Sequence, residues 1–301
     1  MSENALMSVA AVQAAARRVV GSPDLAEARA AAARGARLVM RYPSSELLCA
    51  LALKSATPDL ATITTHAAIV SAAMARDLEA ASATVLQVVD ATFILPLARR
   101  WLAESAGVDL DVFRSLPEPL ERKVACLSAA AALGSDEASR TTACTAYEAA
   151  QLVSASRAAP YDGARAVLPR SMLVAAAWSF AMRCNATEVG ARVSSHEVLK
   201  MMSRDPMYTP WVNVLARVVG QYPVGSVVVL EDKSWAVVAG PPEYQPDRPP
   251  VRRVTDEKGR ALNPAPLWDL GKNGGLPKVA GALDPALCRF NAARALFQDA
   301  P

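Results

Sequence analysis

The pattern of hydrophobic positions divides the chain into a long helical part and a short β part. Up to about residue 220, apolar residues recur at helical spacing within Ala-rich runs, and alanine has the highest helix propensity. After Gly220 the pattern changes to two β-rich runs, residues 226–230 and 235–240, which a short polar turn joins. A third strand is expected within residues 249–259. The chain is therefore predicted to be mainly α, with a small C-terminal β-unit.

The helical pattern predicts a series of helices separated by Pro, Gly and Ser signals. They are expected at residues 25–42, 44–54, 62–78, 83–107, 116–134, 135–158, 171–184, 194–202 and 209–222, with a last short helix within 283–297.

Several residues are predicted to set the ends of these helices. Ser22 and Ser135 are expected as N-caps, and Ser194 with Glu197 forms the spacing of a capping box. Pro96 lies inside the predicted helix 83–107 and is expected to kink or break it. From these signals we predict three segments: N-terminal helices over 1–57, a central helical domain over 58–220, and a β-appendage with a tail over 221–301.

Composition and charge exclude some classes of function. The chain has 301 residues, of which 52% are hydrophobic and 20% charged, so it can bury a substantial core. Its net charge of +3, without a long basic run, gives no support for nucleic-acid binding. No apolar stretch is long enough to predict a membrane span, and the N-terminus lacks the charge order of a secretory signal, so a cytoplasmic location is expected.

Metal-ligating residues are few. The five cysteines, of which Cys49 is the first and Cys288 the last, have no Cys-x-x-Cys spacing, so we expect buried free thiols. The only histidines are His66 and His196, and His196 lies inside the predicted capping box. A cluster of several histidines cannot form within one chain.

Three stretches carry a resemblance to a known family. They are residues 53–78, which include "TTHAAIVSAAMARDL"; residues 171–202, from "SMLVAAAWSF" to the capped helix; and residues 209–259, which include "YPVGSVVVL" and "RPPVRRV". In this order they resemble the HD-GYP family, helical metal-dependent phosphodiesterases of the HD superfamily that hydrolyse cyclic di-GMP. The resemblance implies an HD-domain-like bundle with N-terminal accessory helices and the C-terminal β-unit.

The resemblance also implies a metal centre, and this sequence departs from it. Family members hold their ions with several histidines and aspartates, including an adjacent His-Asp pair, and the ions activate water. His66 matches the first histidine. The His-Asp pair would fall at residues 93–96, which read "FILP", and a late aspartate would fall near Trp178. Residues 117–160, where the family has later histidines, contain none. Apolar side chains supply no lone pair to a cation, so no cofactor is expected.

Some residues keep two interpretations. His66 is either the relic of a ligand position or a helix residue whose ring bonds to a neighbouring carbonyl. Asp90, on the following helix, is expected to pair with His66 or Arg76. Contacts to a ligand or to an acidic partner are expected of a set of arginines, namely Arg165, Arg170, Arg248, Arg252 and Arg253, although those near the β-unit also fit a solvated rim.

Together these features predict a catalytically inactive HD-GYP-like protein, a scaffold or regulator in bacterial signalling that works through other proteins. Its candidate docking surfaces are the exposed faces of the N-terminal helices and the β-appendage. The alternatives are a non-hydrolytic cyclic di-GMP receptor, a residual metal-dependent phosphodiesterase, and a non-catalytic binding domain of the HDOD type. Homodimerisation through the N-terminal helices is left open.

Overall fold

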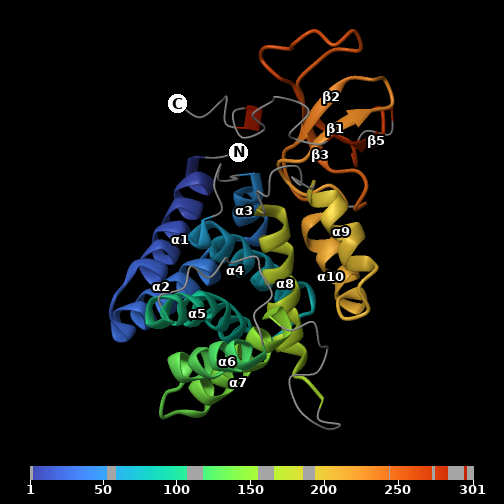
Figure 1. Ribbon diagram of the computed structural model, residues 1–301. Helices are drawn as coiled ribbons and strands as arrows, with labels where there is room; N and C mark the ends of the chain where they lie inside the picture. The colour runs from blue at the N-terminus through green and yellow to red at the C-terminus, as the bar shows by residue number, and fades with distance from the viewer. Residues whose placement is uncertain are drawn as a thin grey trace. The chain divides into compact units, whose positions relative to one another are not determined.

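The computed structural model describes residues 3–52, 59–106, 118–154, 166–185, 194–243, 245–272, 275–283 and 295–296 (Figure 1). These residues are mainly helical, with one small antiparallel sheet near the C-terminal end. The helices are α1 (Glu3–Gly21), α2 (Leu25–Arg41), α3 (Ser44–Leu47), the 3₁₀ helix η1 (Leu48–Ala52), α4 (Leu60–Asp77), α5 (Ser82–Ala106), α6 (Glu118–Ala132), α7 (Glu137–Ser154), α8 (Pro169–Asn185), α9 (Ser195–Ser203) and α10 (Thr209–Val219). The predicted fold class is confirmed at this level.

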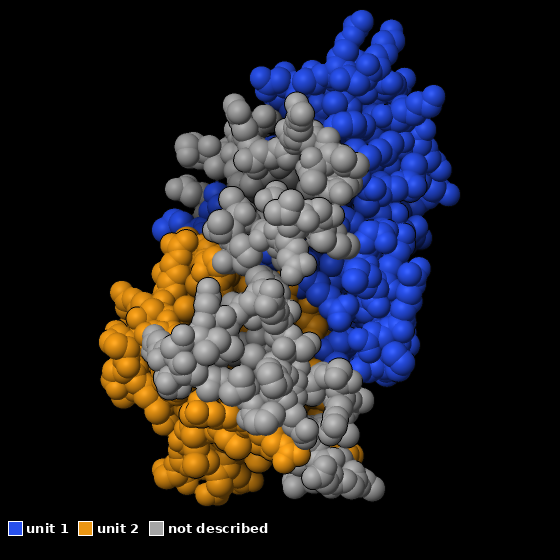
Figure 2. Space-filling model, in the orientation of Figure 1, with its two compact units in different colours: residues 1–9, 43–57, 183–301 blue, residues 10–42, 58–182 orange. Residues whose placement is uncertain are grey.

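The chain divides into two compact units (Figure 2). Unit 1 comprises Met1–Val9, Pro43–Thr57 and Arg183–Pro301, and unit 2 comprises Ala10–Tyr42 and Pro58–Met182. Both units are therefore assembled from separated parts of the chain. The three segments predicted above, 1–57, 58–220 and 221–301, stay a prediction about domains.

Unit 2 is a helical assembly centred on α5. This helix packs against α2, α4, α6 and α7, and α6 and α7 pack along each other. Pro96 lies inside α5, which runs without interruption from Ser82 to Ala106. Of the expected kink or break, the break is therefore wrong, and the kink stays a prediction. Among the described residues, no helix of the protein is long and apolar enough to cross a membrane.

The helix caps differ from two of the three predictions. Asp24, not Ser22, caps α2 by accepting hydrogen bonds from the backbone N–H groups of Ala26 and Glu27. Ser22 Oγ instead donates to the Glu27 carboxylate at 2.7 Å. The negative charge of a carboxylate interacts favourably with the partial positive charge at a helix N-terminus. This explains why Asp24 rather than Ser22 is the N-cap.

Asp136, not Ser135, accepts the hydrogen bonds from the first turn of α7. Its carboxylate accepts from the Ser139 N–H at 2.8 Å and from the Ser139 hydroxyl at 2.9 Å. Half of the capping box predicted for α9 is confirmed, because Ser194 is the N-cap and its Oγ accepts from the Glu197 N–H at 3.2 Å. Glu197 itself forms an ion pair with Lys200 at 2.8 Å.

The sheet of unit 1 has five antiparallel strands in the order β4-β3-β2-β1-β5: β1 to β4 form a meander, and β5 returns to pair with β1. The strands are β1 (Val227–Leu230), β2 (Trp235–Val238), β3 (Pro250–Arg253), β4 (Leu267–Asp269) and β5 (Val279–Ala282). The first three occupy the predicted runs, whereas β4 and β5 were not predicted. The predicted tail helix over 283–297 lies largely outside the described residues.

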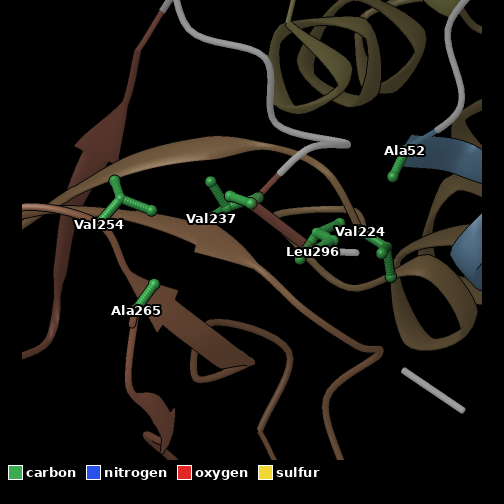
Figure 3. Close-up of a cluster of buried hydrophobic side chains, with 7 residues drawn as sticks. Ala52, Val224, Val237, Val254, Ala265 and Leu296 are labelled. Atoms are coloured by element: carbon green, nitrogen blue, oxygen red, sulfur yellow. The ribbon is translucent and has the colours of Figure 1, made fainter. Parts of the chain in front are cut away.

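Apolar side chains cover both faces of this sheet. One face carries a cluster of Ala52, Val224, Val237, Val254, Ala265, Ala295 and Leu296 (Figure 3). The other face carries a cluster of Tyr222, Val228, Leu230, Ala236, Val238, Val251 and Leu270. Because successive strand residues alternate between faces, burial on both sides explains why β1 and β2 read as continuous apolar runs.

Gly225, in the sequence "YPVG", occupies a position that no other residue fits. Its φ is +85°, and a Cβ atom there would lie 2.6 Å from the Cα of Ala52 in η1. Its N–H donates to the Val238 carbonyl at 2.9 Å. The glycine thus lets the backbone before β1 bond to β2 while touching the backbone of η1.

We predict that Gly225→Ala destabilises unit 1 by about 3 kcal/mol, because strain from the left-handed backbone adds to a clash with backbone atoms. Gly259→Ala is the matched control, since Gly259 also has a positive φ of +77° but open space around it. The control should cost only about 1 kcal/mol. Urea denaturation followed by tryptophan fluorescence measures both, and equal losses would contradict the close approach to Ala52.

Candidate functional site

The candidate site is the interior of unit 2, where the resemblance places the metal ligands. His66 lies in α4 and is 2% exposed. Its side chain has an interaction partner, as do its buried neighbours Thr64 and Thr65, whose hydroxyls donate to the carbonyls of Leu60 and Ala61. His66 is thus a core residue of a helix that is buried along most of its length.

A buried hydrogen bond sets the alignment of α4 and α5. Ser71 Oγ lies 3.2 Å from Thr92 Oγ1, and the Thr92 hydroxyl also lies 2.8 Å from the Val88 carbonyl. The two helices are joined by a short turn and therefore run antiparallel. His66 lies five residues before Ser71, and Leu97 lies five residues after Thr92. In antiparallel helices these two residues therefore stand at the same height, and Leu97 is fully buried.

Phe93 occupies the place where the resemblance puts the His-Asp pair, and α2 is shaped around it. A Cβ atom on Gly35 of α2 would lie 2.6 to 3.0 Å from three carbons of the Phe93 ring. Gly35 and Phe93 are both buried, Phe93 completely. The ring therefore fills the space left by a missing side chain on the facing helix.

The other positions of the expected metal centre are also apolar and buried. Ile94 and Leu95 are at most 4% exposed, and Trp178 and Phe180 of α8 are at most 1% exposed. The indole N–H of Trp178 lies 2.9 Å from the sulfur of Met182, one turn along the same helix. Within the described ranges, no three His, Cys, Asp or Glu side chains gather as the ligands of a metal ion would.

Asp90 of α5 is a buried carboxyl of unit 2 that its surroundings perturb. Burial raises the pKa of its carboxyl from 3.8 to about 6, while Arg29 and Arg37, both of α2, act in the opposite direction. Both arginines come from α2, which packs beside α5 although it is far away along the chain. A pairing of Asp90 with His66 or Arg76 stays a prediction.

Glu148 of α7 is a buried carboxylate that the sequence analysis missed. It is 1% exposed, and its Oε2 accepts from the Leu168 N–H at 2.9 Å and from the Ser171 hydroxyl at 2.7 Å. Both donors stand at the start of α8. Glu148 therefore caps a neighbouring helix, which is favourable because helix N-termini carry free N–H groups and partial positive charge.

Two arginines donate hydrogen bonds to the C-terminal carbonyls of neighbouring helices. Arg76 of α4 donates to the Val39, Met40 and Tyr42 carbonyls at the end of α2. Arg100 of α5 donates to the Val20 and Ser22 carbonyls at the end of α1. Carbonyls in the last turn of a helix have no partner within it, so these side chains satisfy acceptors that would otherwise be orphaned.

The predicted contact arginines are largely engaged within the protein. Arg170 of α8 donates to the Gln87 side chain at 3.2 Å, and Arg165 lies outside the described residues. Arg252 is buried and donates to the Ala265 carbonyl at 3.2 Å. Arg248 is half-buried. The guanidinium groups of Arg170 and Arg252 thus bond within unit 2 and unit 1 respectively.

Arg253 is similarly occupied. It forms an ion pair with Asp232 at 2.8 Å and lies 4.6 Å above the Trp268 ring, which adds a cation–π contact. This environment favours the structural interpretation of the sheet arginines over ligand contact.

The remaining histidine and the cysteines take structural or surface positions. His196 of α9 lies 2.9 Å from the Gln221 carbonyl through Nδ1 and stacks on Tyr222 at 4.8 Å. Since a carbonyl only accepts, Nδ1 carries the hydrogen. Cys49 and Cys184 are buried free thiols as expected, whereas Cys126 and Cys144 are exposed, contrary to the prediction.

Comparisons with known proteins do not assign the chain. No family model matches it, and neither a curated protein nor a solved structure is significantly similar to it.

We predict that the stability of unit 2 falls as pH rises from about 4 to about 6. Folded Asp90 keeps its proton across most of this window whereas the unfolded chain has lost it, so deprotonation favours unfolding by about 3 kcal/mol. Asp90→Asn removes the titrating group and should flatten this part of the curve. Urea midpoints at pH 4, 5, 6 and 7 for both proteins provide the measurement; parallel curves would show that Asp90 is not perturbed.

We further predict that Gly35→Ala lowers the free energy of unfolding by about 2 kcal/mol, because the rigid Phe93 ring leaves no room for a methyl group. Combining it with Phe93→Leu should recover part of the loss relative to the two single variants. Gly21→Ala, at a position with no atom within 4 Å, serves as the neutral control. Strict additivity of Gly35→Ala and Phe93→Leu in thermal or urea denaturation would refute the contact.

Proposed function

We propose that this chain is a catalytically inactive HD-GYP-like protein with an HD-type helical bundle, and that it acts in the cytoplasm as a scaffold or regulator through contacts with other proteins. The observation that carries the proposal is the chemistry of the interior of unit 2. Phe93, Ile94, Leu95 and Trp178 stand where the resemblance places metal-binding side chains, and all are buried.

Physical chemistry explains why such a replacement ends hydrolysis and preserves the fold. A phosphodiesterase of this type needs lone pairs fixed around its cations, and hydrocarbon side chains provide none. A pocket lined by carboxylates without cations would repel itself. Aromatic and aliphatic side chains instead contribute about 25 cal/mol for each Å² that they remove from water.

The alternative of a cyclic di-GMP receptor receives less support. Two phosphates and two guanines require arginines and stacking groups that converge on one pocket. Arg252 and Arg253 are already bonded to Ala265 and Asp232, and Arg253 covers Trp268.

The proposal is tested with purified full-length protein incubated with Mn²⁺ or Fe²⁺ and then desalted. We expect no hydrolysis of cyclic di-GMP above that of the free ions, with an active HD-GYP phosphodiesterase as the positive control. Turnover that a chelator abolishes would overturn the proposal. Calorimetric titration of the same sample with cyclic di-GMP separates the alternative, since micromolar or tighter binding without turnover would identify a receptor.

A further inference from the structure

The outward face of α2 carries a stripe of three arginines. Arg34, Arg37 and Arg41 are all exposed, and their spacing places them on one side of the helix over two turns, about 10 Å. The opposite side is the row of small apolar residues that packs into unit 2, namely Ala28, Ala31, Ala32, Gly35, Ala36 and Val39. We call Arg34, Arg37 and Arg41 the basic stripe.

The fold of unit 2 uses only part of this stripe. The charge of Arg37 acts on the buried Asp90 carboxyl of α5, whereas Arg34 and Arg41 are not among the charges that act on it. Like charges at this spacing destabilise a helix by about 0.2–0.5 kcal/mol per pair. Arg41 lies 5.8 Å from the centre of the Tyr42 ring and in the last turn, where the helix dipole favours a cation. Arg34 lies nearly two turns earlier in the helix, where the helix dipole stabilises a positive charge only weakly.

The stripe has the chemistry of a surface for carboxylates. Guanidinium groups bind carboxylates through paired N–H donors, and arginine is less strongly hydrated than lysine, so it suits interfaces. An acidic helix with Glu or Asp at the same spacing would present one carboxylate to each arginine. The partner would thus match both the charge and the periodicity of α2.

Two other polyanions fit the stripe less well. Nucleic-acid binding faces are larger and more basic, whereas this chain has a net charge of only +3. Helices that lie on anionic membranes insert an apolar face, but the apolar face of α2 is buried within unit 2. A protein segment needs neither an extended basic footprint nor an apolar face.

We propose that the basic stripe docks an acidic helical segment of a partner protein. This inference rests on the proposed function, because it names the chemistry of the partner through which a scaffold would act. The two proposals can nevertheless fail independently. Metal-dependent turnover would contradict the proposed function but would not change which peptide α2 binds.

The test uses a fluorescent, alanine-based helical peptide with glutamates matched to the stripe, and the same peptide with glutamines. We expect the full-length protein to bind the glutamate peptide, as read by anisotropy at 50 mM salt, and to bind it at least tenfold more weakly at 300 mM salt. The variant R34E/R37E/R41E should lose at least tenfold in affinity. The variant R204E/K258E/R260E changes the net charge equally at three exposed positions of unit 1 and should stay within twofold of the unaltered protein.

Circular dichroism of each variant checks that the helices remain, and R34Q/R37Q/R41Q replaces the reversal if folding is impaired. The proposal fails if the glutamate peptide does not bind, if the glutamine peptide binds equally well, or if the two triple reversals lose the same affinity. It also fails if duplex DNA or phosphatidylglycerol vesicles bind more tightly through the same three arginines.

Discussion

Unit 2 depends on charged side chains that satisfy the ends of neighbouring helices. Its helices are rich in alanine, and an alanine side chain buries only one methyl group, worth about 0.8 kcal/mol. Faces of such small residues pack closely but tolerate sliding, because one alanine resembles the next. Arg76, Arg100 and Glu148 remove this freedom, since each bonds to a defined end of α2, α1 or α8.

The same unit shows how a protein interior can accommodate large aromatic side chains. Phe93 fits because Gly35 offers no side chain on the facing helix, and Trp178 finds a sulfur acceptor within its own helix. Each aromatic residue is thus matched by a local feature. His66 is buried in the same unit, and among the described residues it belongs to no group of potential metal ligands.

Sequence reasoning predicted what periodicity controls and missed what long-range contacts control. The helices from α2 onward and the strands β1, β2 and β3 follow from apolar spacing, whereas α1 was expected only as part of the N-terminal helices over 1–57. The strands β4 and β5 escaped because "LWD" and "VAGA" are too short and too mixed in character to predict a strand. The caps of α2 and α7 were misplaced by one or two residues, the usual uncertainty at helix ends. The partners of Asp90, Arg76 and Glu148 lie on other helices, so no local pattern could reveal them.

The touching backbones of Ala52 and Gly225 have a consequence for the biogenesis of the protein. The apolar segment of η1, "LCALA", is synthesised long before the sheet that covers it, because β1 begins only at Val227. At ordinary translation rates the ribosome needs on the order of 10 s to synthesise the intervening chain. During that delay the segment has no native neighbour from the sheet, so nascent chains of this protein should depend on chaperones until the last strands emerge.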